Sequence, residues 1–290
     1  MSLDEGSAGI TIVVPVYNGF SALIRCLRAL EQQAGPARVL LIDDASTDVR
    51  VLPLLRQYSE RNQWQLQRHR QNRGFVHTAN AGLQQADGHV VLLNADAIVT
   101  PRWLHALRLV IESTSDLATA TPWSNNAEIC SFPRFLTNHS VPAYADDLAE
   151  SLFRYHRPRY PRIPTGVGFC LLITAAAKKR IGLLDESTFG HGYGEENDYC
   201  LRAAAAGMKN VLIDNAYVAH IGNQSFADLG LKADEHSMRR LLGKHPHYRQ
   251  MIAEYIAADP LASLRCEIMS TLKKHRPQLA AQLDDRHDEP

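Results

Sequence analysis

Apolar and amphipathic segments alternate regularly over the first hundred residues, and this alternation limits the folds that the chain can adopt. Short segments with strand character occur at residues 10–16, 39–42, 64–67 and 90–93. Between them, helical spacing of apolar side chains is found in residues 21–30, 51–58 and 75–86. Strands that alternate with helices in this way form a parallel sheet with helices on both faces. We therefore predict an α/β fold with a doubly wound, mostly parallel sheet.

Polar residues follow two of the predicted strands directly. The second strand runs into Asp43 and Asp44, and the fourth runs into Asn94-Ala95-Asp96. In an open α/β sheet, ligands bind beyond the carboxyl ends of the strands. The alternative is that Asp96 only fixes the next loop, with Thr100 as the N-cap of a helix. This stretch taken alone leaves both interpretations open.

The turn after the first strand, PVYNGF, contains no phosphate-binding glycine pattern. It has neither the GxGxxG of dinucleotide-binding turns nor the GxxxxGK[ST] of a P-loop. A phosphate ligand would therefore need another partner, and a divalent metal held by carboxylates is the usual one. This increases the interest of Asp96 as a metal ligand.

A glycine-rich segment later in the chain, FGHGYGEEND at residues 189–198, leads into a predicted helix at residues 199–206. Acids in the first turn of a helix complement its dipole, and this explanation suffices for Asp198. Glu195 and Glu196 follow a flexible loop, a pattern typical of a movable acid/base pair. Strands are predicted near residues 166–174, 211–213 and 217–220, and His220 matters only if it converges on Asp96.

The segment between these regions and the end of the chain give weaker signals. Residues 122–164 are rich in Pro, Asn and Arg and predict long loops around one helix near residues 147–155. Amphipathic helices are predicted at residues 229–242, 248–257 and 260–274, and a disordered end at residues 284–290. Their basic side chains could meet anionic lipid, although a solvated helix face explains them equally: Arg239, Arg240, Lys244, Lys273, Lys274 and Arg276.

Composition narrows the partners. Lys plus Arg and Asp plus Glu each number 31, so no net charge recruits nucleic acid. No apolar stretch reaches the length of a membrane span, and the first residues do not resemble a signal peptide. We therefore expect a cytoplasmic protein, with peripheral contact at the inner face of the cell membrane left open. The five cysteines lack any CxxC pair and are expected to be buried, reduced thiols.

Six blocks in order resemble one family. PVYN, IDDASTD, NRGFVHTANAG, LLNADAIVTP, FGHGYGEENDYCLRAAAAG and VAHIGNQSF are similar to the family 2 glycosyltransferases with a GT-A fold. The resemblance covers about residues 10–226, and the GYGEEND block is similar to members that build bacterial surface polysaccharides, including O-antigen. It implies a GT-A domain at residues 1–225, with a nucleotide-sugar half (10–122) and an acceptor half (123–225). A helical extension would follow at residues 226–290.

The resemblance also implies roles in donor binding. Pro15, Tyr17 and Asn18 would line the nucleoside pocket, and Asp44, together with Asp43, would bind the base or ribose. Asn72 and Arg73 would approach the pyrophosphate or base. Asn94-Ala95-Asp96 stands in place of the DXD metal motif, so Asp96 would bind Mn²⁺ or Mg²⁺ with His220, and Asn94 would reach the ribose or a metal-bound water. Imidazole favours Mn²⁺ somewhat.

For catalysis, the resemblance implies that Glu196 is the general base and Glu195 its partner. The reaction would be an inverting transfer from a nucleoside-diphosphate sugar, UDP or dTDP, to a hydroxyl of a glycan or lipid-linked acceptor. Trp123, Asn125 and Asn126 are candidates for the sugar or acceptor site, and the two Asn could equally be turn residues. A homodimer is left open.

Three other functions compete. A nucleotidyltransferase should have a glycine-rich, basic loop after the first strand, and PVYNGF is not one. A glycosidase also uses two carboxylates but needs no nucleotide pocket. A non-catalytic nucleotide-sugar-binding module would keep the fold without turnover, and Asn94 in place of an acid is the feature in its favour.

Overall fold

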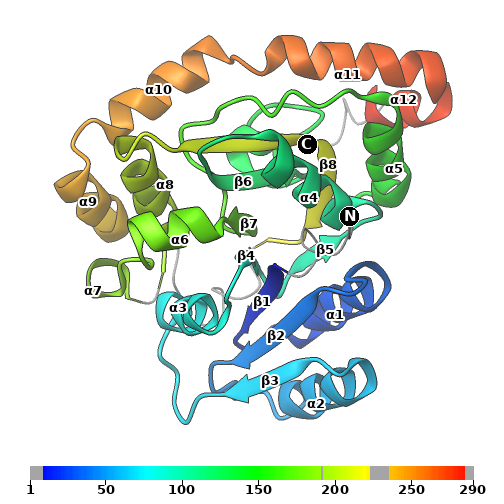
Figure 1. Ribbon diagram of the computed structural model, residues 1–290. Helices are drawn as coiled ribbons and strands as arrows, with labels where there is room; N and C mark the ends of the chain where they lie inside the picture. Colours follow the sequence, from blue (N-terminus) through cyan, green and yellow to red (C-terminus); the bar gives the residue numbers. More distant parts are fainter. Residues whose placement is uncertain (1–8, 191, 223–234, 285–290) are drawn as a thin grey trace, which may run out of the picture.

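One eight-stranded sheet runs through the described part of the computed structural model, with helices on both faces (Figure 1). The structure describes residues 9–190, 192–222 and 235–284. The strand order is β3-β2-β1-β4-β7-β6-β8-β5. The strands are β1 (Ile10–Val16), β2 (Arg38–Asp43), β3 (Gln65–Arg68), β4 (His89–Leu93), β5 (Ala97–Val99), β6 (Leu117–Trp123), β7 (Cys170–Ile173) and β8 (Lys209–His220).

Most strands run in the same direction, as predicted. β1 pairs in parallel with β2 and β4, β2 with β3, and β6 with β8. Only β7, which separates β4 from β6, and the short edge strand β5 run antiparallel to their neighbours. The α/β class with a mostly parallel central sheet is therefore confirmed.

Within the described residues, each helix that the sequence predicts is found at or near its predicted place. The helices are α1 (Phe20–Gln33), α2 (Val51–Asn62), α3 (Phe75–Gln85), α4 (Trp103–Ser113), α5 (Ala145–Tyr155), α6 (Ala175–Ile181), α7 (Glu186–Phe189), α8 (Glu195–Ala205), α9 (Glu235–Lys244), α10 (Tyr248–Ala258), α11 (Ala262–His275) and α12 (Pro277–Asp284), with a 3₁₀ turn at Glu128–Cys130.

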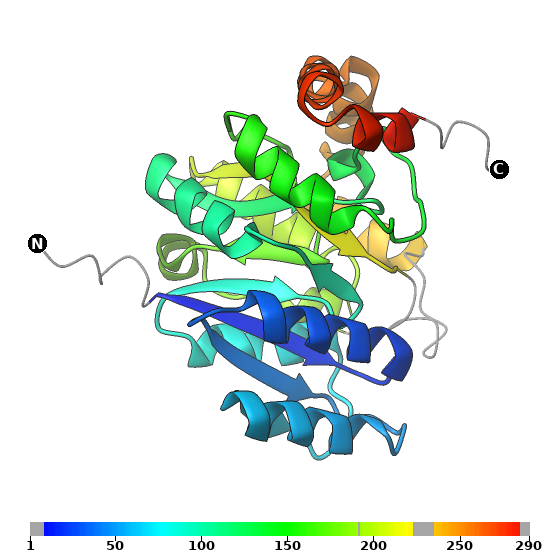
Figure 2. The same cartoon turned by 90° about the vertical axis from the view of Figure 1, so that its right-hand side faces the viewer.

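The central strands β2, β4 and β7 contribute alternate residues to two separate cores. In β4, Val91 and Leu93 join the core that α1, α2, α4 and α5 cover, while Val90 and Leu92 join the core under α3, α6 and α8. The first set of helices faces the viewer in Figure 2. This period of two explains why the central strands are apolar throughout, since both of their faces are buried.

Local details differ from the sequence predictions. Gly19, with φ of 65°, precedes α1, and Ser21 does not cap it. Thr100 is not an N-cap either: α4 begins at Trp103, and the Thr100 hydroxyl instead donates a hydrogen bond to the Tyr217 carbonyl of β8. The two strands predicted between residues 211 and 220 are one strand, whose register shifts between its pairings with Pro122 and Trp123.

The C-terminal helices add to the two cores. Leu241 of α9 is buried in the core under α3 and α8, whereas Leu264 and Ile268 of α11 and Leu283 of α12 join the other core. Helix α12 was not predicted. Residues 229–234 of the first predicted tail helix, the boundary between residues 225 and 226, and residues 285–290 lie outside the described residues.

The basic side chains proposed for a lipid surface mostly have partners within the chain. Lys244 pairs with Asp185 and Asp198, and Arg276 pairs with Asp147. Lys273 pairs with Asp284, and Arg240 donates to the Ser237 hydroxyl. No helix among the described residues is long and apolar enough to cross a bilayer.

The cysteines correct one expectation. Cys26, Cys130, Cys170 and Cys200 are buried and free, as predicted, but Cys266 of α11 is exposed. Burial raises the pKa of all four buried thiols, so they stay protonated.

Close packing of α3 on β1 predicts the effect of one methyl group. A Cβ at Gly82 would lie 2.3 Å from Cγ1 of Val13, so we expect Gly82→Ala to destabilise the fold by about 1–3 kcal/mol. Gly243→Ala in α9 meets nothing within 4 Å and should leave stability unchanged or raise it by up to about 1 kcal/mol. Urea unfolding of both variants measures this, and equal midpoints would contradict the packing argument.

Candidate active site

Asp96 and His220 meet at the end of the sheet. β5 pairs antiparallel with β8, and Ala97 lies opposite His220, the last residue of β8. This register brings Asp96, which precedes Ala97, next to His220. His220 Nε2 lies 3.4 Å from Asp96 Oδ1. The Asp96 carboxylate is almost fully buried, yet Oδ1 has no hydrogen-bond partner among the described residues.

The ring of His220 is held in one orientation. Its Nδ1 lies 2.7 Å from the carbonyl oxygen of Asn126, and since a carbonyl can only accept, Nδ1 carries a hydrogen. The ring also stacks on Phe169, with centroids 5.1 Å apart. Nε2 therefore directs either a lone pair or, in the imidazolium, a proton at Asp96. Burial alone would lower the pKa of His220, but Asp96 and the Asn126 carbonyl outweigh it and raise the pKa.

This pair has the features of two metal ligands. The contact of Nδ1 with a carbonyl is the arrangement that orients histidines bound to metals. No group of three or more His, Cys, Asp or Glu side chains suited to a metal occurs among the described residues. A cation here would therefore take two ligands from the chain and the others from its substrate or water.

Asn125 fixes the backbone of His220. Its Oδ1 accepts a hydrogen bond from the His220 amide at 2.9 Å, and its Nδ2 donates to the His220 and His139 carbonyls at 2.8 and 2.6 Å. Asn125 thus braces the site, and Asn126 contributes its backbone carbonyl. Neither amide was predicted to have this role.

Trp123 corrects an expectation. Its side chain is fully buried, its Nε1 donates to the Asp214 carbonyl at 3.2 Å, and its ring packs against Phe132. A ring enclosed in this way offers no face to a sugar, so Trp123 is a core residue.

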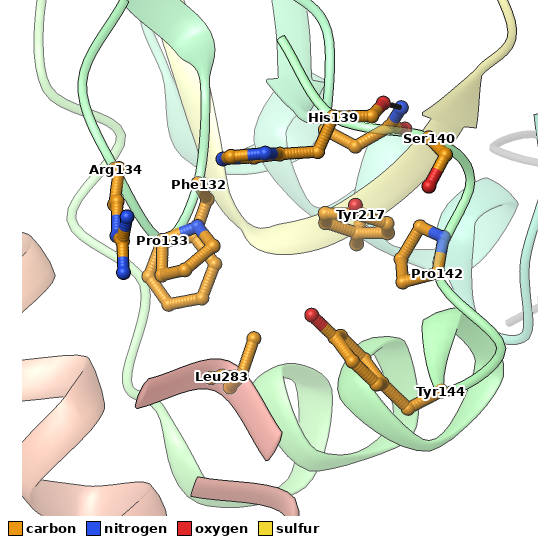
Figure 3. Close-up of a pocket in the computed structure, with 10 residues that line it drawn as sticks. Phe132, Pro133, Arg134, His139, Ser140, Pro142, Tyr144, Tyr217 and Leu283 are labelled. Carbon is orange, nitrogen blue, oxygen red and sulfur yellow. Dashed lines mark hydrogen bonds between the residues drawn. The ribbon is translucent and has the colours of Figure 1, made fainter. Parts of the chain in front are cut away.

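A small pocket adjoins this region. Asn125 contributes to its wall, together with His139, Tyr144 and Leu283 of α12 (Figure 3). Asn125 thus lies between this pocket and His220.

Glu195 and Glu196 open α8, directly after Gly194 in a left-handed conformation. One carboxylate oxygen of each, Oε2, is buried and has no hydrogen-bond partner among the residues that the structure describes. Burial raises the pKa of both, and the Glu196 charge raises that of Glu195 further, to well above its usual range. Asn197 donates to Glu196 Oε1 at 3.3 Å. Glu195 is buried and Glu196 half-buried, and acids with a raised pKa are suited to proton transfer near neutral pH.

Tyr193 is a site residue that was not predicted. It adopts φ of 69° within the glycine-rich loop. Burial raises its pKa, and the charges of Glu195, Glu196 and Asp96 raise it further. The only sequence signal was its position between two glycines.

Two predicted nucleotide-binding residues are engaged in shaping loops. Asn18 Oδ1 accepts hydrogen bonds from the amides of Thr47 and Asp48. Asp44 accepts from the amides of Arg73 and Gly74, each at 2.8 Å, and from His69. Their carboxylate and amide oxygens therefore hold together the loops at the ends of β1, β2 and β3.

The other predicted donor-site residues lie at the same edge. Pro15 is buried in β1, Tyr17 follows it half-buried, and the Arg73 side chain is exposed. Asp43 accepts from the Ser46 amide, and its Oδ2 lies 3.2 Å from Arg68. The side-chain Nδ2 of Asn72 is buried and has no hydrogen-bond partner in the described residues. The backbone N–H of Asn94 donates to the Phe169 carbonyl.

The acid pair predicts a pH-dependent stability. Because the pKa of Glu195 is raised on folding, its carboxyl favours the folded state at acid pH, and this contribution is lost as the pH rises through the folded-state pKa. We expect Glu195→Gln to melt about 2 °C or more above the wild type at pH 8, with a smaller difference at pH 5. Glu60→Gln, at an exposed position of α2, is the matched control. Equal pH dependence of all three proteins would contradict the argument.

Comparison with known proteins gives the fold a wider context. The chain is 26% identical over 245 residues to the uncharacterised glycosyltransferase YwdF of Bacillus subtilis, covering 81% of this chain and 84% of that protein. An uncharacterised Mycobacterium tuberculosis protein is 31% identical over 84 residues, which is 29% of this chain and only 32% of that protein.

Solved structures share the fold at low sequence identity. The mannosyltransferase PcManGT of Pyrobaculum calidifontis, in complex with GDP-Man and Mn²⁺, matches with a TM-score of 0.55 at 16% identity, over 96% of this chain and 78% of that one. Staphylococcus aureus TarS 1-349 matches with a TM-score of 0.54 at 16% identity, over 95% and 83%. GalNAc-T7 with UDP, GalNAc and Mn²⁺ has a TM-score of 0.62 at 16% identity, over 82% of this chain but 48% of that chain.

A family profile covers the sheet half of the molecule. The profile of glycosyl transferase family 2 matches residues 11–180, more than half of the chain. This range contains Asp43, Asp44 and Asp96, and the topology is that of the GT-A fold. The chain therefore belongs to glycosyl transferase family 2.

Proposed function

We propose that this protein is an inverting glycosyltransferase, which moves a sugar from a UDP or dTDP sugar to a hydroxyl of a glycan or lipid-linked acceptor. The observation that carries the proposal is the convergence of unsatisfied acids at one edge of the sheet. Asp96 faces His220, whose ring stacks on Phe169, and a Cβ at the preceding residue, Gly168, would lie 3.8 Å from Glu196.

The donor site would lie beyond β1, β2 and β4. Pro15, Tyr17 and Asn18 would border the nucleoside, with Asp43 and Asp44 at the base or ribose. The exposed guanidinium of Arg73 and the unpaired Nδ2 of Asn72 are suited to phosphate or base oxygens. Asn94 would reach the ribose or a metal-bound water.

Asp96 and His220 fit a divalent cation, since an orphaned carboxylate oxygen faces an oriented imidazole nitrogen. When bound there, Mn²⁺ or Mg²⁺ would offset the charge that grows on the departing diphosphate. The Mn²⁺ in two of the similar structures supports this assignment, and imidazole favours Mn²⁺ somewhat.

The two acids would have different roles in proton transfer. Glu195 has its pKa raised further, so it would keep its proton and orient the acceptor. Glu196 would be the ionised partner and take the proton of the acceptor hydroxyl. The acceptor oxygen then bonds to the anomeric carbon as the bond from that carbon to the diphosphate oxygen breaks. Attack on the face opposite the leaving group inverts the anomeric centre.

Ligand-dependent melting tests the donor site. We expect one of UDP, dTDP or GDP, or its sugar, to raise the melting temperature with Mn²⁺ and little without it, because a ligand that binds the folded state stabilises it. Asp96→Ala should abolish the metal-dependent rise. Asp87→Ala, an exposed acid before β4 at the other end of the strand, is the matched control and should keep it. A rise that survives Asp96→Ala would contradict the assigned metal ligand.

Removal of the base tests the enzyme against the binding module. We expect Glu196→Gln to reduce hydrolysis of the stabilising nucleotide sugar by about 10²–10⁴-fold, because the amide cannot accept the proton. The ligand-induced rise in melting temperature should persist, since the metal and nucleotide contacts remain. A wild type that binds a nucleotide sugar but shows neither hydrolysis nor transfer would favour the non-catalytic module.

A further inference from the structure

The first turn of α8, which carries the acid pair, is held by the C-terminal helices. Asp198 lies there with its side chain fully buried, and two residues at the end of α9 reach it. Lys244 Nζ and His245 Nε2 lie 2.7 and 2.8 Å from Asp198 Oδ1, while Arg202 Nε binds Oδ2 at 2.8 Å. Burial acts to raise the pKa of Asp198, but these three hydrogen bonds outweigh it and lower the pKa.

Apolar contacts join the same elements. Leu241 of α9 shares a core with Phe189, the last residue of α7. Lys244 Nζ lies 5.7 Å from the centre of the Phe189 ring. A Cβ at Gly194 would lie 3.0 Å from Phe189 and 3.8 Å from Leu241, so α9 closes over the end of the glycine-rich loop.

A chain of hydrogen bonds leads from α10 to the acid pair. The Tyr248 hydroxyl donates to Asn197 Oδ1 at 3.1 Å. This contact fixes the amide so that its Nδ2 donates to Glu196 Oε1 at 3.3 Å. The other oxygen, Glu196 Oε2, is buried and accepts no hydrogen bond from the described part of the chain. One oxygen is thus held in place while the other stays available.

We propose that Tyr248 and Asn197 are positioning residues, which orient Glu196 so that Oε2 faces the proton it accepts. The C-terminal extension is then part of the catalytic apparatus. This inference rests on the proposed function for its kinetic consequence, because a poorly oriented base slows the chemical step without weakening donor binding.

A pair of tyrosine variants on one helix tests this. Tyr248→Phe removes the hydroxyl and keeps the ring, and Tyr255→Phe, also in α10, removes a buried hydroxyl that has no hydrogen-bond partner in the described residues. With the nucleotide sugar that stabilises the protein most, we expect Tyr248→Phe to lower kcat for Mn²⁺-dependent hydrolysis about tenfold at unchanged KM. Tyr255→Phe should stay within about twofold. Equal kcat for both variants would overturn the proposal.

A cycle with Asn197 adds a second kinetic criterion. If the two residues act through one chain of hydrogen bonds, Asn197→Ala should lower kcat as Tyr248→Phe does, and the double variant should lose no more than either single one. Losses that multiply would show independent effects and overturn the relay.

A spectroscopic measurement separates this inference from the proposed function. In protein labelled with ¹³C at glutamate carboxyls, we expect the Glu196 signal, assigned by its loss in Glu196→Gln, to shift in Tyr248→Phe and not in Tyr255→Phe. An unmoved signal would overturn the proposal whether or not the protein turns over. A shifted signal in a protein without any turnover would retain the positioning contact and reject the transferase function.

Discussion

The antiparallel pairing of β5 with β8 is the contact on which the site depends. Three residues of β5 fix which side chain of β8 stands beside Asp96, and the Ile221 amide donates to the Asp96 carbonyl at 3.0 Å to close the ladder. A slip of one residue would turn His220 to the opposite face of the strand. Thr100, bound to the Tyr217 carbonyl, and Asn125, bound to the His220 amide and carbonyl, hold the same register from outside the ladder.

Two of the Asp–His contacts in the described residues separate a structural role from a functional one. Asp214 meets His156 at 2.8 Å, and its oxygens also accept from the amides of Arg159 and Tyr160. Asp96 Oδ1 lies 3.4 Å from His220 Nε2 and accepts no hydrogen bond from the described residues. A buried carboxylate oxygen that lacks a hydrogen bond costs about 1–3 kcal/mol or more, and this free-energy cost applies at Asp96 but not at Asp214. The acids of α8 show the same contrast. Both carboxylate oxygens of Asp198 have partners, whereas Glu195 Oε2 and Glu196 Oε2 have no hydrogen bond in the described residues.

Local patterns predicted most of the fold and part of the site. Apolar runs located the central strands because these are buried on both faces, and the position of Asp96 after β4 followed from the end of that run. The missed features depend on contacts between distant residues. β5 is only three residues long and is a strand because it pairs with β8. Trp123 is buried by packing that its neighbours in sequence do not indicate. Asp44 accepts hydrogen bonds from backbone amides about 30 residues away in the sequence. The sequence alone therefore did not predict that Asp96 meets His220; it predicted only that His220 would matter if the two residues met.

The C-terminal helices connect the two faces of the sheet. α9 packs against α7 and α8, while α11 packs against α5 on the other side, and α10 crosses between them along the top of Figure 1. An amphipathic helix is expected to bury its apolar side against another surface, and here that surface is the sheet domain of the same chain. α8 begins directly after the glycine-rich loop, and the C-terminal helices support its N-terminal turn. Asp198, Asn197 and Gly194 obtain that support from Lys244, Tyr248 and Leu241, so the last part of the chain fixes the geometry of the acids that precede it.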